Sequence, residues 1–202
     1  MTLQTRIAPE VAPDSRIPVL ETERLVLRAP CLDDVPALVL LLNDRRISEN
    51  LSRAPYPYAR KDAVAFIKGL NRSDDETALL VTLPDGTLVG GCGVGLLAGT
   101  YPEIGYWFGV AYWGRGYATE VARAVVAYAF DELGHEALEA GARVSNPASR
   151  RVLEKCGYVW TGVTLARVRA LGGVSVPCDR FHLDRARWRE QVAESRAGCG
   201  IG

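Results

Sequence analysis

A short glycine-bearing segment contains the residues best suited to hold an anion. The segment WGRGYAT spans residues 113–119 and follows an apolar, aromatic run, Ile104–Val110, that is typical of a buried strand. The apolar residues at and after its end lie on one face of a helix, at Ala118, Val121, Ala122, Val125, Val126, Ala129 and Leu133. In a strand–turn–helix unit, the free N–H groups and the positive end of the helix point into one small space. Gly114 and Gly116 also let the backbone come close to a ligand, so the sequence predicts a phosphate or pyrophosphate site.

Two side chains of this segment have both a structural and a binding interpretation. Arg115 is either a solvated loop arginine or a phosphate contact, and the sequence favours neither. Thr119 lies in the first helical turn, where its hydroxyl either bonds to the backbone or reaches a phosphate oxygen. The prediction for Gly114, Gly116 and Ala118 concerns the backbone alone.

A second candidate group begins at Asn146. Asparagine at the N-cap, followed by Pro147 at the first helical position, is a typical helix start. Ser149 lies one turn further on the same helix, where a serine is often a surface or capping residue. From the residues alone, both positions are explained by the helix.

The cysteines and histidines do not indicate a metal site. The five cysteines are scattered, odd in number and without CxxC spacing, so we interpret them as reduced thiols of a cytosolic protein. His135 and His182 are far apart in sequence, which makes a zinc site an unattractive interpretation. Cys156 precedes Gly157 at a helix end with no nearby histidine, and we predict that it is a packed thiol rather than a nucleophile.

Composition and charge predict a single globular domain. The chain has 202 residues, 48% of them hydrophobic, which is enough for one full core. Lys+Arg and Asp+Glu both number 24, so nothing suggests nucleic acid or an acidic membrane as a partner. No run of apolar residues is typical of a signal peptide or a membrane span, and we expect a cytoplasmic location. We predict a flexible leader over residues 1–20, one domain over 21–195 and a flexible tail over 196–202.

The hydrophobic periodicity predicts alternating strands and helices. The expected strands span residues 22–28, 78–83, 88–97, 104–110, 137–144, 158–163 and 178–183. The expected helices run from a cap at Asp33-Asp34 to Leu42 and over residues 60–70, 118–133, 147–156 and 184–195. A turn at residues 84–87 makes a hairpin of the second and third strands, and the segments 43–58 and 164–177 have the weakest patterns.

One glycine motif points to a different fold. Residues 93–98 satisfy the dinucleotide-binding pattern GxGxxA after a strand. The next residues, Gly99-Thr100-Tyr101-Pro102, cannot open a helix, and without that helix the pyrophosphate has no N-terminus to bind. We therefore reject a Rossmann fold and interpret Gly93 and Gly95 as sites of bulges or close packing within a strand.

The glycine-bearing segment resembles the coenzyme A loop of the GNAT superfamily of N-acetyltransferases. That loop reads Gln/Arg-x-x-Gly-x-Gly/Ala, with Gly116 and Ala118 at its matching positions. Trp113 replaces the usual Gln or Arg, which is similar to the branch that includes the ribosomal-protein N-terminal acetyltransferases. ETERLVLR near the start, the hairpin and NPASRRVLEKCGY near the end also fit, so the resemblance extends over residues 22–183.

The resemblance implies an α/β (α+β) GNAT fold. Its mixed central sheet would have about seven strands, flanked by four or five helices. The strand before the glycine segment and the next strand would splay apart, and pantetheine would fill the gap like an extra strand. The backbone around Trp107 and Phe108 would then face pantetheine and stabilise the oxyanion at the thioester carbonyl. Of the side chains of Tyr106, Trp107 and Phe108, at least two are more simply explained as core.

The resemblance also assigns the remaining cofactor contacts. The residues expected to bind coenzyme A are Trp107, Phe108, Gly114, Arg115, Gly116, Tyr117, Ala118, Thr119 and Asn146. The Asn146 amide would lie near pantetheine, as in the family pattern Asn-x-x-Ser/Ala. In the ribosomal-protein branch, the serine matching Ser149 is proposed to protonate the leaving thiolate. Many members have a tyrosine where this chain has Leu153, which leaves Ser149 as the candidate acid.

Direct transfer of the acetyl group requires a neutral amine as nucleophile. Since an alkylammonium has a pKa of about 10, a base is needed to remove its proton. Glu103, at the start of the central strand, is the candidate base, acting directly or through water, although it is equally explained as a solvated strand-end glutamate. Asp44, Glu49 and Glu76 are alternatives.

The resemblance thus implies an acyltransferase that moves the acetyl group of acetyl-CoA, its cosubstrate, to a primary amine without a metal. The branch favours a protein N-terminus as acceptor. A small amine (polyamine, antibiotic or amino acid) and a non-catalytic acyl-CoA-binding module are the alternatives. We expect the acceptor pocket to form from residues 43–58 and a loop at 164–177, in a monomer or homodimer.

Overall fold

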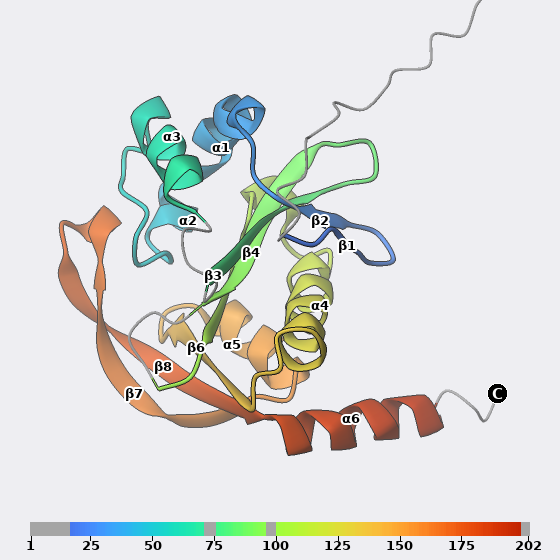
Figure 1. Ribbon diagram of the computed structural model, residues 1–202. Coiled ribbons are helices and arrows are strands. Elements are labelled where there is room, and N and C mark those ends of the chain that lie inside the picture. The colour runs from blue at the N-terminus through green and yellow to red at the C-terminus, as the bar shows by residue number, and fades with distance from the viewer. Residues whose placement is uncertain (1–16, 71–75, 96–99, 199–202) are drawn as a thin grey trace, which may run out of the picture.

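The computed structural model describes residues 17–70, 76–95 and 100–198. Within this part of the chain, eight strands form one sheet in the order β1-β2-β3-β4-β5-β6-β8-β7 (Figure 1). The strands are β1 (Leu20–Glu21), β2 (Val26–Arg28), β3 (Glu76–Thr82), β4 (Leu88–Gly95), β5 (Glu103–Phe108), β6 (Ala137–Arg143), β7 (Val159–Val168) and β8 (Val174–Asp184). The helices are α1 (Val35–Leu42), α2 (Arg45–Ser48), α3 (Arg60–Gly69), α4 (Tyr117–Asp131), α5 (Pro147–Lys155) and α6 (Arg185–Gly198). The α/β class and the GNAT-type sheet are confirmed, with one more strand than expected.

The sheet separates in its middle. All neighbouring strands pair antiparallel except β5 and β6, which are parallel. β5 and β6 pair at only two positions, Glu103 with Glu139 and Ile104 with Ala140. The rest of β5 keeps its pairing with β4 up to Phe108, so its opposite edge, from Gly105 onward, has no strand partner among the described residues. This is the predicted splay of the central strands.

The two faces of the sheet carry cores of different size (Figure 1). One face packs against α4 and α5 in a core of 24 buried residues, which includes Ile104 and Phe108 of β5. The other face packs against α1, α2 and α3 in a core of eight buried residues, with Trp107 of β5 against it. Because successive side chains of a strand point to opposite faces, β5 contributes to both cores. The larger core holds the glycine segment, and the smaller core leaves room for a cavity.

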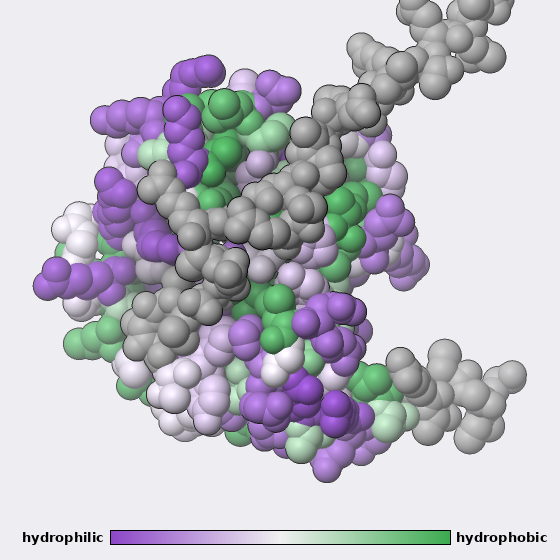
Figure 2. Space-filling view, viewed as in Figure 1, coloured by the Kyte–Doolittle hydropathy of each residue, from purple (hydrophilic) through white to green (hydrophobic). Residues whose placement is uncertain are grey.

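Hydrophilic residues cover much of the visible surface (Figure 2). Hydrophobic residues form smaller separate areas, one of them between α1 and α3. Among the described residues, no helix is long and apolar enough to cross a membrane.

The last two strands extend further than the sequence indicates. The expected loop at residues 164–177 is wrong: β7 continues to Val168, β8 begins at Val174, and a short 3-10 helix, Arg169–Leu171, joins them. In the part of the hairpin that was not expected, residues 164–168 and 174–177, most side chains are exposed, whereas β8 has buried side chains from Cys178 onward. Without a buried face there is no hydrophobic alternation to mark a strand.

Smaller differences lie near the ends of the chain. The expected strand at 22–28 is split, since Thr22 and Leu25 form a turn between β1 and β2. α2 was not expected, and α6 reaches Gly198. Residues 1–16 and 199–202, which contain most of the predicted leader and tail, lie outside the described residues, so the domain boundaries stay predictions.

The rejection of a Rossmann fold agrees with the topology. The next described strand after β4 is β5, and the two pair antiparallel, whereas a dinucleotide fold requires parallel strands joined by a helix. A Cβ atom added at Gly93 would lie 2.6 Å from the carbonyl oxygen of Thr77, so this glycine allows close packing, as predicted. Residues 96–98 of the motif, and with them the end of the strand expected at 88–97, lie outside the described residues.

Candidate active site

The glycine segment, residues 113–119, forms a tight turn at the start of α4. Gly114 and Gly116 have φ angles of 75° and 82°, in the left-handed region that favours glycine. Gly116 is the N-cap of α4, and its carbonyl oxygen accepts hydrogen bonds from the N–H groups of Thr119 and Glu120, both at 3.1 Å. The earlier N–H groups of the helix have no acceptor within it, so they are available to an anion. The turn therefore has the geometry that a phosphate site requires.

Two contacts fix the turn from either side. The indole Nε1 of Trp113 donates to the carbonyl oxygen of Phe108 at 2.8 Å, which ties the turn to the end of β5. Arg24 donates from Nη1 to the carbonyl oxygen of Arg115 at 3.0 Å, and its Nη2 forms an ion pair with Glu120 at 2.6 Å. The Arg24 guanidinium also lies 4.9 Å from the centre of the Tyr117 ring.

Arg24 was missed by the sequence analysis. Its Nη2 atom lies 3.4 Å from the position that a Cβ atom on Gly116 would occupy, so a cation stands directly beside the turn. Glu120 accepts hydrogen bonds from the Thr22 hydroxyl and the Arg24 N–H. Burial opposes ionisation of Glu120, but these bonds and the Arg24 charge outweigh it and lower the pKa of the carboxyl. No local sequence pattern could have predicted this contact, because Arg24 and Glu120 are 96 positions apart.

Arg115 and Thr119, the two side chains of the turn whose roles the sequence left open, have different surroundings. Arg115 is exposed, with its guanidinium 5.8 Å from the centre of the Tyr112 ring. Thr119 is half-buried in the first turn of α4. A phosphate contact by either side chain stays a prediction.

The open edge of β5 lies next to the turn. On its β4 side, Trp107 pairs with Gly91 and Phe108 with Gly90, while the edge that faces β6 is free of strand pairing. The Phe108 side chain is buried, and those of Trp107 and Tyr106 pack against the cores, as expected for core side chains. The unpaired strand edge suits an extended ligand chain and the turn suits its phosphates, so the residues present fit coenzyme A.

The helix after β6 presents Asn146 and Ser149. The Asn146 Oδ1 atom accepts a hydrogen bond from the Ser149 N–H at 3.2 Å, so Asn146 caps α5 as predicted. The Ser149 Oγ atom lies 3.0 Å from the Tyr106 hydroxyl, which also donates to the Ser149 carbonyl oxygen at 3.2 Å. Burial raises the pKa of Tyr106 above its usual range, against the effect of the Ser149 hydrogen bond, so the phenol stays protonated.

Tyr106 is therefore more than a core residue. Its ring packs against the larger core, as predicted, but its hydroxyl contacts the candidate acid. Strand alternation places Tyr106 on the same face as Ile104 and Phe108, and this was the one available signal. The partner, Ser149, is 43 positions away and comes from the fold.

Leu153 and Cys156, near the end of α5, provide neither an acid nor a nucleophile. Leu153 is buried in the larger core. Cys156 is buried too, with its Sγ atom 4.0 Å from the Thr119 carbonyl oxygen, and burial raises the pKa of its thiol to about 11. A neutral, packed thiol is a poor nucleophile, which agrees with the interpretation from the sequence.

Every candidate base is paired with an arginine. Glu103 forms an ion pair with Arg180, whose Nη2 atom also lies 3.0 Å from Glu139. Burial disfavours the charge of Arg180 and lowers its pKa. The hydrogen bond and charge of Glu103, with a further contribution from Glu139, outweigh this effect, so the pKa of Arg180 is raised. Among the alternatives, Asp44 pairs with Arg46, Glu49 with Arg45 and Glu76 with Arg53.

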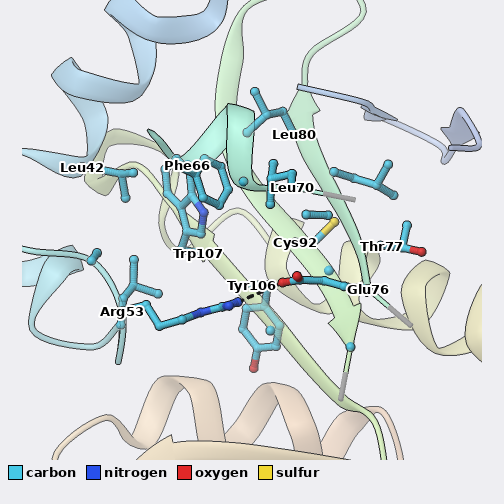
Figure 3. A pocket seen from close by; sticks show the side chains of 18 of the residues that line it. Leu42, Arg53, Phe66, Leu70, Glu76, Thr77, Leu80, Cys92, Tyr106 and Trp107 are labelled. Carbon is cyan, nitrogen blue, oxygen red and sulfur yellow. Dashed lines mark hydrogen bonds and ion pairs between the residues drawn. The ribbon is translucent and has the colours of Figure 1, made fainter. Parts of the chain in front are cut away.

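A cavity of about 420 Å³ lies between α3 and the sheet (Figure 3). We call it the α3 cavity, and Glu103, Gly105, Tyr106 and Trp107 of β5 line one side of it. Segment 43–58 contributes, as predicted, but the expected contribution of 164–177 is confined to Arg169. α3, β3 and β4 supply most of the remaining lining, which the sequence analysis did not anticipate.

No metal site emerges from these groups. Among residues 17–70, 76–95 and 100–198, no cluster of three or more His, Cys, Asp or Glu side chains is placed to hold an ion.

Comparison with known proteins identifies the family. The family described as "Acetyltransferase (GNAT) domain" matches residues 24–159, more than half of the chain. The chain is 25% identical over 158 residues to the uncharacterized N-acetyltransferase p20 of Bacillus licheniformis, an alignment that covers 76% of this chain and 89% of that relative.

Two solved structures show the breadth of acceptors on this fold. RimL, a ribosomal L7/L12 α-N-protein acetyltransferase in complex with coenzyme A, has a TM-score of 0.71 at 18% identity, covering 83% of this chain and 98% of that one. The spermidine N-acetyltransferase of Vibrio cholerae, in complex with CoA and spermine, has a TM-score of 0.68 at 18% identity, covering 81% and 97%. These likenesses confirm the fold, and the family match confirms the resemblance seen in the sequence. The chain belongs to the GNAT family and is an acetyl-CoA-dependent N-acetyltransferase that acts on an amine.

Proposed function

We propose that the chain transfers the acetyl group directly from acetyl-CoA to a primary amine in a ternary complex, with a protein N-terminal amine as the favoured acceptor. The observation that supports this most is the meeting of two spaces at Gly105. The α3 cavity reaches this residue from one side, and the free edge of β5 begins at the same residue. An amine in the cavity and a thioester along the edge would meet there, as direct transfer requires.

The cofactor side consists largely of backbone groups. In this proposal the turn and first helical residues, 114–119, hold the diphosphate through N–H groups and the helix end, with Arg24 adding a positive charge beside them. The free edge at Trp107 and Phe108 binds pantetheine, and a backbone N–H there stabilises charge on the thioester carbonyl. The Asn146 amide completes the pantetheine site from the start of α5.

Proton transfers are assigned to opposite faces of β5. Ser149 is the proposed acid for the leaving thiolate, and Tyr106 positions its hydroxyl through the 3.0 Å contact. Glu103 is the proposed base for the ammonium of the acceptor, acting directly or through water, and it lines the cavity. Arg180 holds the Glu103 carboxylate in place through their ion pair. This division gives the acid to the cofactor side and the base to the acceptor side.

A small-molecule amine is the second candidate acceptor. The volume of the α3 cavity, about 420 Å³, is within the range of pockets for small ligands. A non-catalytic acyl-CoA-binding module is the alternative that a single assay removes.

The test is thiol release from acetyl-CoA with a panel of primary amines and of peptides with free N-termini. We expect release that depends on the acceptor, with intersecting initial-rate patterns. Coenzyme A binding without release for any amine would instead identify a binding module. Ping-pong kinetics or an isolated acetyl group on Cys156 would contradict direct transfer.

A further inference from the structure

The floor of the α3 cavity is formed by three strands in continuous register. Residues that face the cavity stand in rows across β3, β4 and β5. The rows are Leu80–Gly91–Trp107, Ala78–Gly93–Gly105 and Glu76–Gly95–Glu103. The rows thus differ in chemistry: the first is bulky and apolar, the second nearly bare, and the third carries two carboxylates.

The middle row has no side chain larger than a methyl group. A Cβ atom added at Gly105 would have no heavy atom within 4 Å, so the space above it is open. Gly105 is also the first residue of the free edge of β5. A flat group lying over this row would therefore be held against backbone, directly beside the place where β5 and β6 separate.

The first row and the helices above it form an apolar wall. The Trp107 indole lies over Gly91, where a Cβ atom would come within 2.6 Å of its Nε1 atom. Phe66 and Leu70 close this side from α3 and its end, and Phe66 lies beside Trp107 in Figure 3. Aromatic and aliphatic walls around a bare floor favour a flat or branched apolar group.

The third row does not offer unpaired negative charge. Arg53 extends toward Glu76 in Figure 3, and their Nη2 and Oε1 atoms are 3.1 Å apart. Glu103 is paired with Arg180, which also contacts Glu139. A polyamine binds through several ammonium groups, and here each carboxylate of the row already has a cationic partner. A further carboxylate on the cavity, that of Asp62, accepts a hydrogen bond from the Ala59 N–H at the start of α3. The charges of the third row therefore favour an acceptor with a single amine.

We infer that the acceptor is a primary amine borne beside an aromatic or branched aliphatic group, which lies over Gly105 while the amine points to the free edge of β5. The inference rests on the proposed transfer reaction and deepens it by naming the acceptor class. Such a group is supplied either by a free arylalkylamine or by a peptide whose first residue has a large apolar side chain. Gly105 sets the size of the group, because any side chain there would occupy its space.

The experiment compares kcat/KM for four acceptors in the wild-type chain. The acceptors are 2-phenylethylamine, a peptide beginning with phenylalanine, the same peptide beginning with glycine, and spermidine. We expect kcat/KM for 2-phenylethylamine or for the phenylalanine peptide to be about tenfold or more above the values for both the glycine peptide and spermidine, the discrimination that an apolar pocket provides. The two apolar acceptors distinguish a free amine from a protein N-terminus. A preference for spermidine or for the glycine peptide would overturn the inference.

Gly105→Leu tests the site itself, with Gly105→Ala as the graded control. The backbone of Gly105 lies outside the left-handed region, so both variants fit the strand. We expect Gly105→Leu to lower kcat/KM for the apolar acceptor about tenfold or more, Gly105→Ala to have a smaller effect, and the Kd for acetyl-CoA to stay within about twofold. An unchanged preference in Gly105→Leu with intact acetyl-CoA binding would overturn the inference. If this variant does not fold, Gly105→Ala and the wild-type panel decide.

Arg53→Ala tests the pairing of the acidic row. Arg53 is 70% exposed, so its loss leaves the fold intact while it frees the Glu76 carboxylate. We expect kcat/KM for spermidine to rise severalfold relative to that for the apolar amine. An unchanged ratio of the two values would overturn the role given to the ion pair. Absence of thiol release with every acceptor is a different result, since it contradicts the proposed transfer reaction itself.

Discussion

The two faces of β5 differ in the groups that they present: backbone groups on the α4 face and side chains on the α3 face. On the α4 face, the glycine turn, the helix start and the free strand edge present backbone N–H groups to a ligand. On the α3 face, the cavity is shaped by side chains, and by their absence, from six elements and the segment between α2 and α3. Every residue except proline offers a backbone N–H, whereas the shape of the cavity depends on which side chains line it. In the proposed function, the face that binds the common cosubstrate is thus separate from the face that determines the acceptor.

The packing of the two faces follows the same division. The core under α4 has 24 buried residues and holds the turn rigidly through the end of β5 and the start of α4. The core under α1, α2 and α3 has eight, and the space that they leave unfilled is the α3 cavity. On the floor of this cavity Gly105 has open space for a side chain, whereas a Cβ atom at Gly93 would clash with the Thr77 carbonyl oxygen, so the shape of the pocket can change at some positions and not at others.

The largest expected effect separates the faces at Gly116. Gly116→Asp places a carboxylate where the diphosphate is proposed to bind, and like charges in a partly desolvated site repel each other. We expect the Kd for coenzyme A to rise about 100-fold, or about 2.7 kcal/mol. Gly116→Asn is the matched control, since asparagine tolerates a positive φ and carries no charge. Calorimetry on folded protein checks both variants, and equal affinities would remove the phosphate site from this turn.

The site could be predicted from the sequence only where it is local. A strand, a glycine turn and an amphipathic helix are contiguous, so residues 104–133 predicted an anion site at the turn, and the elements on both sides of it are confirmed. The N-cap at Asn146 is local as well, and it was predicted for the same reason. Such patterns depend on residues a few positions apart, which a single sequence displays directly.

Contacts between distant segments could not be predicted in this way. The Arg24–Glu120 and Arg180–Glu103 pairs join residues 96 and 77 positions apart. The rows on the cavity floor depend on strand register, which no single segment records. The hairpin of β7 and β8 was shortened in the prediction because its exposed faces lack alternation. Such contacts were missed on both sides: Arg24 beside the glycine turn, and the contributions of α3, β3 and β4 to the α3 cavity, although Glu103 and segment 43–58 were predicted.

Ser149→Ala tests the acid on the α4 face. General acid catalysis contributes about 10²–10⁴-fold, and a thiolate is a tolerable leaving group, so we expect kcat to fall by about tenfold to 100-fold. The Kd for acetyl-CoA should stay within about twofold. Tyr106→Phe keeps the ring and removes the hydroxyl that contacts Ser149, and a smaller fall in kcat is expected. Steady-state kinetics with a fixed acceptor checks both, and full activity of Ser149→Ala would leave this proton to water.

Glu103→Gln tests the base on the opposite face. Arg180 retains Glu139 as a partner, so the fold should survive. We expect kcat/KM for the acceptor to fall about tenfold near neutral pH and to approach the wild-type value toward pH 10, where the amine is already neutral. A pH–rate profile of both proteins provides the measurement. A loss of equal size at every pH would give Glu103 a structural role instead.

Asn146→Asp separates capping from cofactor binding on the α4 face. Aspartate is as good an N-cap as asparagine, so the melting temperature should hold. The carboxylate cannot donate the hydrogen bond that an amide offers to pantetheine, and we expect coenzyme A affinity to fall about threefold to tenfold. Thermal unfolding and calorimetry on the same sample distinguish the two roles. If affinity and stability both hold, the residue is a cap alone.

The smallest expected effect compares the ion pairs that anchor the two faces. Arg24–Glu120 lies beside the glycine turn, and Arg28–Asp34 lies at the start of α1, where the Asp34 side chain is 8% exposed. For Asp34, burial opposes ionisation, but the hydrogen bonds and charge of Arg28 outweigh it, so its pKa, like that of Glu120, is lowered. At pH 7 we expect Asp34→Asn to lower the melting temperature more than Glu120→Gln does, because its pair is the more buried.

Coenzyme A affinity should respond in the opposite order. Glu120→Gln should raise the Kd by less than about threefold, since it loosens Arg24 beside the turn but leaves the backbone N–H groups in place, and Asp34→Asn should not change it.

A carboxylate with a lowered pKa stabilises the fold at pH values above its unfolded pKa, about 4. That contribution is lost as the pH falls through the folded pKa, so the stability of each variant should converge on the wild type below pH 4. Unfolding curves from pH 7 to pH 3 measure this convergence. A constant difference in stability between variant and wild type across that range would show that the charges of these pairs do not contribute to the stability of either face.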